Sequence, residues 1–234
     1  MYDIVIIGAG VVGGMIAREL ARYELKICIL EKENDVAMGA TKANSAIVHA
    51  GFDAKEGSMK AKMNVRGSQM MQKVAEELGV KYIRNESLVV AFESEREEVE
   101  AIYERGVKNG VEGLRIVEHD ELMALEPNLN PELSCALLAP TGAIVCPYEL
   151  CISAIGNAMD NGADLKLNFE VAFYYSKLFF GRRATSDPFY FIKLFGCKSC
   201  FCNRNVILWK TEIRKFIVAN SYNVAYLIPI IIGI

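Results

Sequence analysis

The sequence predicts an α/β protein in which a parallel sheet is interrupted by an inserted domain of mixed α+β structure. Three observations predict this class. Residues 3–31 read as a strand, a glycine turn, a helix and a second strand. Short strand-like and helical segments follow over residues 80–146, and residues 147–171 read as a further helix and strand. Parallel neighbours need a crossover connection that is usually helical, so the first and last segments belong to one sheet.

The opening turn has the spacing of a dinucleotide-binding fingerprint. The apolar run Ile4–Ile7 leads directly into Gly8-Ala9-Gly10-Val11-Val12-Gly13, which fits G-x-G-x-x-G. Gly8 permits a tight turn, Gly10 lets the backbone approach a pyrophosphate, and Gly13 lets the next helix pack closely on the strand. The helix N-terminus then offers free N–H groups to the phosphates. This Rossmann-like start predicts dinucleotide binding; a βαβ unit without a ligand is the alternative.

A carboxylate follows at the distance expected of a ribose-binding residue. Glu31 ends the apolar strand Lys26–Leu30, about 20 residues after the glycines, where it accepts hydrogen bonds from a ribose 2′-hydroxyl. Its charge would repel a 2′-phosphate. The sequence therefore argues against NADP and leaves FAD or NAD.

The polar loop 39–45 comes next. Thr41, Asn44 and Ser45 supply hydroxyl and amide groups and Lys42 supplies a cation, which suits a second wall for a phosphate and a flavin. Without the fingerprint, an ordinary solvated loop would be the better interpretation.

The fingerprint and the segment Gly39–Gly51 together resemble FAD-dependent oxidoreductases of the D-amino-acid-oxidase-like superfamily. They are most similar to the anaerobic-type glycerol-3-phosphate dehydrogenases and the L-2-hydroxyglutarate oxidases. In those families an N-S-x-x-x-H-[AS]-G segment runs beside the flavin ring, and the resemblance puts Asn44, Ser45 and His49 there. The likeness covers residues 1–171 and includes Gly57–Lys62, Leu125–Leu129, Ala139–Val145 and Pro147–Leu150.

The resemblance implies a Rossmann-like FAD-binding domain with an inserted mixed α+β substrate domain, incomplete at the C-terminus. We expect a βαβ unit, flavin loop and long helix over residues 1–79, a partial substrate domain over 80–146, and a return to the FAD-binding domain over 147–171. The residues expected to bind FAD are Gly8, Ala9, Gly10, Val12, Gly13, Glu31, Lys32, Thr41, Asn44, Ser45 and His49.

Periodicity and turn residues predict the remaining elements. The helix Ser58–Leu78 carries a methionine stripe that we expect to be core, and Gly79 stops it. The further expectations are strands Val80–Ile83 and Leu88–Phe92, a charged helix Glu93–Gly110 with Val107 facing inward, a strand Leu114–Val117, a helix from Asp120 that stops before Pro127, a strand pair over Leu133–Val145 turning at Pro140–Gly142, a helix Pro147–Asn161, and a strand Asp164–Val171.

The chemistry implied by the resemblance is oxidation of a small secondary alcohol, such as glycerol 3-phosphate or a 2-hydroxy acid. It needs hydride transfer to flavin N5, a base for the hydroxyl proton, and an electron acceptor. His49 is the only histidine in a flavin-proximal segment and is the catalytic candidate. The alternative is that His49 only packs and hydrogen-bonds beside the flavin. An NAD-binding protein is a weaker alternative.

The composition changes at about residue 172. Residues 172–234 hold 14 Phe, Tyr or Trp, 9 Lys+Arg and 2 Asp+Glu, against 8, 17 and 27 in residues 1–171. The family pattern also ends there, so we expect an atypical tail, out of frame after a frameshift, and a truncated form with impaired activity. The alternatives are a divergent tail that binds a membrane surface or a partner, and a non-catalytic dinucleotide-binding remnant or interaction protein. Cys197, Cys200 and Cys202 lack a fourth ligand for zinc, so no metal site is expected.

Bulk composition narrows the partners. The net charge of −3 favours neither nucleic acid nor an anionic membrane. Seven cysteines, an odd number, and the absence of a signal peptide before the first strand favour reduced thiols in the cytoplasm. No apolar run reaches the roughly 18 residues of a transmembrane helix.

Overall fold

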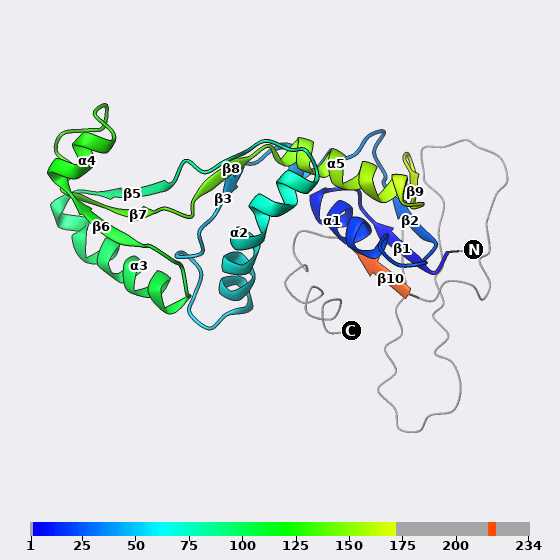
Figure 1. The fold of residues 1–234 in the computed structure, drawn as a ribbon, viewed down its shortest axis with the longest axis horizontal. Helices are drawn as coiled ribbons and strands as arrows, with labels where there is room; N and C mark the ends of the chain where they lie inside the picture. The colour runs from blue at the N-terminus through cyan, green and yellow to red at the C-terminus, as the bar shows by residue number, and fades with distance from the viewer. Residues whose placement is uncertain (1, 172–214, 219–234) are drawn as a thin grey trace, which may run out of the picture. The chain divides into compact units, whose positions relative to one another are not determined.

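The computed structural model describes residues 2–171 and 215–218, which belong to two compact units (Figure 1). Unit 1 combines Met1–Asn44 with Pro147–Ile234, and unit 2 is Ser45–Cys146. The divisions between the compact units fall after Asn44 and before Pro147, and the expected functional domains 1–79, 80–146 and 147–171 stay predictions. Strand β3 (Ile47–Val48) pairs with a strand of unit 2, which places the predicted flavin segment from Ser45 onwards in that unit and leaves Asn44 in unit 1.

Unit 1 is a parallel sheet with strand order β10-β1-β2-β9. The strands are β1 (Ile4–Ile7), β2 (Ile27–Leu30), β9 (Asp164–Lys166) and β10 (Lys215–Val218). All three neighbouring pairs are parallel, with Ile4 opposite Ile27 and opposite Lys215. Strand β10 belongs to the tail in which the sequence shows no regular periodicity; the rest of that tail lies outside the described residues.

Two helices pack together in unit 1. Helix α1 (Val11–Leu20) follows the glycine turn and α5 (Pro147–Asp160) precedes β9, and the two lie side by side in Figure 1. A Cβ atom added to Gly14 would lie 2.9 Å from Cγ1 of Ile155, so the absence of a side chain there permits the close approach. The sequence assigned this packing role to Gly13, and the structure adds Gly14. Ile6, Ile29 and the inner faces of both helices form one core.

Unit 2 contains two three-stranded antiparallel sheets. The first has the order β3-β8-β4 and the second β5-β7-β6. Their further strands are β4 (Tyr82–Ile83), β5 (Ser87–Ala91), β6 (Arg115–Glu118), β7 (Cys135–Ala139) and β8 (Ala143–Val145).

The predicted hairpin over Leu133–Val145 is wrong. Strands β7 and β8 do not pair with each other, because both pair antiparallel with the segment 82–91: Ala139 lies opposite Ser87, and Val145 lies opposite Tyr82. The bend between them is matched on the opposite segment, where the Glu86 N–H donates to the Gly142 carbonyl at 2.9 Å. Pro140–Gly142 is therefore a bend in one ribbon and not a hairpin turn.

Three α-helices complete unit 2: α2 (Met59–Glu77), α3 (Arg96–Lys108) and α4 (His119–Leu125). Short 3₁₀ turns are η1 (Ala40–Lys42), in unit 1, and η2 (Glu93–Glu95). Ser58 caps α2, since its Oγ accepts a hydrogen bond from the Ala61 N–H. Gly79 follows the helix with φ of +67°, as its predicted stop.

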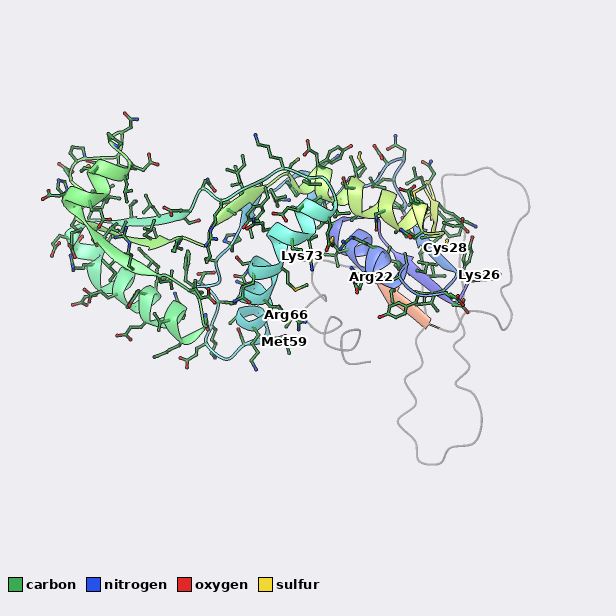
Figure 2. The ribbon with its side chains drawn as sticks, in the orientation of Figure 1. Arg22, Lys26, Cys28, Met59, Arg66 and Lys73 are labelled. Carbon is green, nitrogen blue, oxygen red and sulfur yellow. The ribbon has the colours of Figure 1, made fainter. Side chains whose placement is uncertain are left out.

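The methionine stripe of α2 is not a buried core. Met59 is 40% exposed and Met70 is 49% exposed, while only Ala61 and Ala75 of this helix are buried. Met59, Arg66 and Lys73 project from α2 in Figure 2. The inward assignment of Val107 on α3 is also wrong, because 51% of it is exposed. Within the described residues, no helix has the length and apolar content to cross a membrane.

Candidate functional site

The glycine turn of unit 1 is fixed by hydrogen bonds to three distant segments. Gly8, with φ of +104°, donates its N–H to the Leu30 carbonyl at 2.8 Å. The Ala9 N–H donates to Oε2 of Glu31 at 2.7 Å. The Ala9 carbonyl accepts from the Ala37 N–H at 2.9 Å and from Sγ of Cys151 at 3.4 Å. The turn is therefore held in one conformation by β2, by the loop after it and by α5.

The N-terminus of α1 has backbone N–H groups without an acceptor among the described residues. Gly10 is the N-cap and has no side chain to cap the helix. The Val11 N–H donates to Oγ1 of Thr41 at 3.0 Å. The first intrahelical hydrogen bond runs from the Gly14 N–H to the Gly10 carbonyl at 2.9 Å. The N–H groups of Val12 and Gly13 come before this donor and make no hydrogen bond within the described residues. These two donors and the positive end of the helix dipole form an anion-binding arrangement.

Thr41 is the buried residue of the polar loop 39–45. It is 8% exposed, and a Cβ atom added to Gly10 would lie 3.2 Å from its hydroxyl. A side chain at residue 10 would therefore press on the hydroxyl that accepts from the helix N-terminus. The close contact with Thr41 therefore explains why residue 10 is a glycine, in addition to the predicted approach of a pyrophosphate.

Glu31 uses both carboxylate oxygens on the backbone. Oε2 accepts from Ala9, and Oε1 accepts from the Glu33 N–H at 3.0 Å. Each oxygen keeps a second acceptor position, so the carboxylate retains capacity for a ribose hydroxyl. Lys32 is largely exposed and its Nζ lies 3.5 Å from Oε1 of Glu33. The structure thus brings Glu31 to the turn, whereas Lys32 makes an exposed ion pair.

The expected flavin-proximal residues divide between the two units. The Asn44 side-chain amide donates to the carbonyls of Ala40 and Thr41 at 3.2 and 2.9 Å, so it stabilises η1 in unit 1. Ser45 precedes β3 and His49 follows it, both exposed and both in unit 2. Their roles beside a flavin stay predictions.

Sequence reasoning missed Cys151 and Ala37. Both reach the Ala9 carbonyl, and Ala37 adopts φ of +60° to do so. Burial raises the pKa of the Cys151 thiol to about 11, so it stays a neutral donor. No spacing rule links residue 151 to the turn, because the contact arises from the packing of α5. Within residues 2–171, no group of three or more His, Cys, Asp or Glu could hold a metal ion.

Comparison with known proteins identifies relatives of this chain. The family model described as FAD dependent oxidoreductase matches residues 3–174. A glycerol 3-phosphate dehydrogenase of Caloramator mitchellensis is 41% identical over 206 residues, covering 87% of this chain and 43% of the relative. A mitochondrial L-2-hydroxyglutarate dehydrogenase of Pongo abelii is 36% identical over 173 residues, covering 73% of this chain and 41% of the relative.

A solved structure of an FAD-containing oxidase has a similar fold. L-alpha-glycerophosphate oxidase from Mycoplasma pneumoniae, with FAD bound, superposes with a TM-score of 0.71 at 30% identity, covering 76% of this chain and 47% of that one. The chain therefore spans less than half the length of these relatives. The alignment with the Caloramator relative covers 87% of this chain, which is more than 171 residues. The similarity therefore extends past residue 171, where we expected the family pattern to end.

Proposed function

The chain belongs to the family of FAD-dependent oxidoreductases, and from that premise we propose that unit 1 binds the ADP end of FAD in an enzyme that oxidises a small secondary alcohol. The observation that carries the proposal is the uncapped N-terminus of α1. The N–H groups of Val12 and Gly13 have no partner among residues 2–171, and they follow a turn whose Ala9 amide donates to Glu31. A pyrophosphate matches this donor set, and a ribose matches the neighbouring carboxylate.

Three residues of the turn and its surroundings have groups suited to FAD. Val12 and Gly13 would hold the pyrophosphate through their N–H groups, and Glu31 would accept from a ribose hydroxyl. Thr41 would keep the start of the helix in place, since its hydroxyl already accepts from Val11 at 3.0 Å. Glu31 would repel a 2′-phosphate, so FAD should bind and NADP should not.

We propose glycerol 3-phosphate or a 2-hydroxy acid as the substrate. The names of the relatives support this choice, since glycerol 3-phosphate and L-2-hydroxyglutarate both carry a secondary hydroxyl near an anionic group, a phosphate or a carboxylate. When bound, the flavin supplies the hydride acceptor for that carbon. His49 would accept the hydroxyl proton at an imidazole nitrogen; its support is its place in the N-S-x-x-x-H-A-G segment and its exposure.

An electron acceptor for the reduced flavin is part of the same proposal.

We also propose that the protein is located in the cytoplasm. The cysteines of the described residues, Cys28, Cys135, Cys146 and Cys151, are free thiols, which supports a reducing compartment.

Flavin content and flavin bleaching test the proposal separately. The purified chain should carry, or take up, FAD and show the absorbance of oxidised flavin. Anaerobic addition of glycerol 3-phosphate or L-2-hydroxyglutarate should then bleach that absorbance. A second candidate is a flavin binder without catalysis, since the hydrogen bonds described at the turn all concern the ADP end of the cofactor. Bound flavin that neither substrate bleaches would support this binder, and a folded chain that takes up no FAD would refute both.

A further inference from the structure

The carbonyl of Ala9 is held by two donors from distant parts of unit 1. The Ala37 N–H donates to it at 2.9 Å, and Sγ of Cys151 donates to it at 3.4 Å. Ala9 is fully buried, and its own N–H donates to Glu31. The two peptide groups that flank the Ala9 Cα atom are therefore both fixed, one through its N–H and the other through its carbonyl.

The contacts of this carbonyl also set the direction of the Gly10 N–H. The Ala9–Gly10 peptide is trans, and the C=O and N–H of a planar trans peptide point in opposite directions. Because the carbonyl faces the Cys151 thiol and the Ala37 amide, the Gly10 N–H faces away from both. It makes no hydrogen bond within the described residues, so its hydrogen-bonding capacity is left for a ligand.

The position of Cys151 follows from how α5 packs on α1. Four buried residues recur at helical spacing on one face of α5: Cys151, Ala154, Ile155 and Ala158. A Cβ atom added to Gly14 would lie 2.9 Å from Cγ1 of Ile155 and 3.5 Å from Cβ of Ala154, so this face meets α1 where that helix has no side chain. The contact between the two helices thereby brings the thiol to the glycine turn.

The thiol of Cys151 remains a donor near neutral pH. Burial raises the pKa of this thiol to about 11, so the S–H form persists there. A thiol is a weaker donor than a backbone N–H, so Cys151 adds to the contact made by Ala37 and does not replace it. The effect of the thiol on the turn is therefore expected to be that of one modest hydrogen bond.

We propose that Cys151 is a positioning residue of the dinucleotide site: together with the Ala37 N–H it fixes the Ala9–Gly10 peptide so that the Gly10 N–H donates to a phosphate oxygen of the bound nucleotide. The proposal rests on the binding function proposed above, and it adds to that site a residue 142 positions from the turn. A donor whose direction is already fixed loses less conformational freedom on binding, so the thiol raises the affinity for the nucleotide.

Calorimetric titration of the purified chain with ADP tests this role through two variants of almost equal size. Cys151→Ala removes the donor, and Cys151→Ser replaces it by a hydroxyl. ADP should bind Cys151→Ala about 3- to 10-fold more weakly than the wild type, which is the effect of one neutral hydrogen bond. Cys151→Ser should recover most of the affinity. Cys151→Val, which fills the space without a donor, should weaken ADP as Cys151→Ala does.

Cys28→Ala is the matched control for loss of a buried thiol. Cys28 lies in β2 of the same unit (Figure 2), it is 1% exposed, and its Sγ lies 4.0 Å from the carbonyl of its neighbour Ile29. Its removal should lower the free energy of unfolding and leave the affinity for ADP unchanged. Circular dichroism confirms that each variant is folded.

The amide resonances of the turn give a second measurement. ADP should shift the amide resonances of Gly10, Val12 and Gly13 in the wild type, because each N–H gains a charged phosphate acceptor. At saturating ADP the shift of Gly10 should be smaller in Cys151→Ala, while those of Val12 and Gly13 persist. A purely structural role of Cys151 would lower the stability of the fold and leave the Gly10 shift as it is in the wild type.

The outcomes separate the role of Cys151 from the proposed function. A folded wild type that binds no ADP would overturn both. Equal ADP affinity and an equal Gly10 shift in the wild type and Cys151→Ala would overturn the role of Cys151 and leave the dinucleotide site in place. An equal loss of affinity in Cys28→Ala would also overturn this role, since the loss would then come from weakening of the core.

Discussion

Replacing Glu31 by glutamine tests how the glycine turn is held. The two carboxylate oxygens accept from the N–H groups of Ala9 and Glu33 at 2.7 and 3.0 Å. A glutamine amide has only one oxygen, so in either orientation its NH₂ group faces one of these two donors. A hydrogen bond to a charged acceptor contributes about 1.5–3 kcal/mol, and a donor left without a partner costs a similar amount. We therefore expect Glu31→Gln to lower the free energy of unfolding by about 1.5–3 kcal/mol.

Urea unfolding and amide hydrogen exchange measure this loss. If opening is local, the Ala9 or the Glu33 amide should exchange roughly 10- to 100-fold faster in Glu31→Gln, since each 1.4 kcal/mol is a factor of ten. Glu33→Gln is the control, because it removes only an exposed ion pair to Lys32, which contributes about 0–1 kcal/mol. Equal unfolding free energy and equal exchange in Glu31→Gln and the wild type would refute the account of the turn.

Three further changes test the packing, the buried thiol and the proposed base. Gly14→Val should lower the unfolding free energy by about 1–3 kcal/mol, because its Cβ would lie 2.9 Å from a side-chain carbon of α5; Gly156→Ala, with open space around it, should be neutral or stabilising by up to about 1 kcal/mol. The raised pKa of the Cys151 thiol stabilises the folded state fully below its ordinary value of 9.0, and this contribution is lost as the pH rises towards about 11. The urea midpoint should therefore fall over this pH range less in Cys151→Ala than in the wild type, and at pH 8 an alkylating reagent should modify the exposed Cys146 before Cys151. His49→Ala should slow flavin reduction by substrate about 10²- to 10⁴-fold per bound flavin, and an unchanged rate would remove His49 as the base.

Local patterns were sufficient for the elements whose ends are fixed by nearby residues. The run Ile4–Ile7 before Gly8 predicted β1 and the turn, and Ser58 and Gly79 predicted both ends of α2. The strand pairing over 135–145 could not be predicted in the same way. Alternation identifies strands but not their partners, and the partner segment 82–91 lies about 50 residues earlier.

Burial is a property of the whole fold, so periodicity alone did not determine it. The helical spacing of Met59 and Met70 indicates one apolar face of α2, yet both side chains are substantially exposed. At the candidate site, spacing indicated Glu31 as the acceptor for a ribose hydroxyl, and this role stays a prediction. Spacing could not show that the carboxylate binds the backbone amide of Ala9, or that Cys151 reaches the same residue from 142 positions away.

Binding of nucleotides to the purified chain tests the central claim most directly. Equilibrium titration with FAD, ADP and NADP, on protein shown to be folded by circular dichroism, measures the affinity of unit 1 for each. We predict that FAD and ADP compete for one site. NADP should bind at least about 10-fold more weakly than FAD and ADP, because Glu31 repels its 2′-phosphate, and Glu31→Gln should weaken the binding of FAD. A folded chain that binds neither FAD nor ADP would contradict the assignment of the glycine turn as a dinucleotide site.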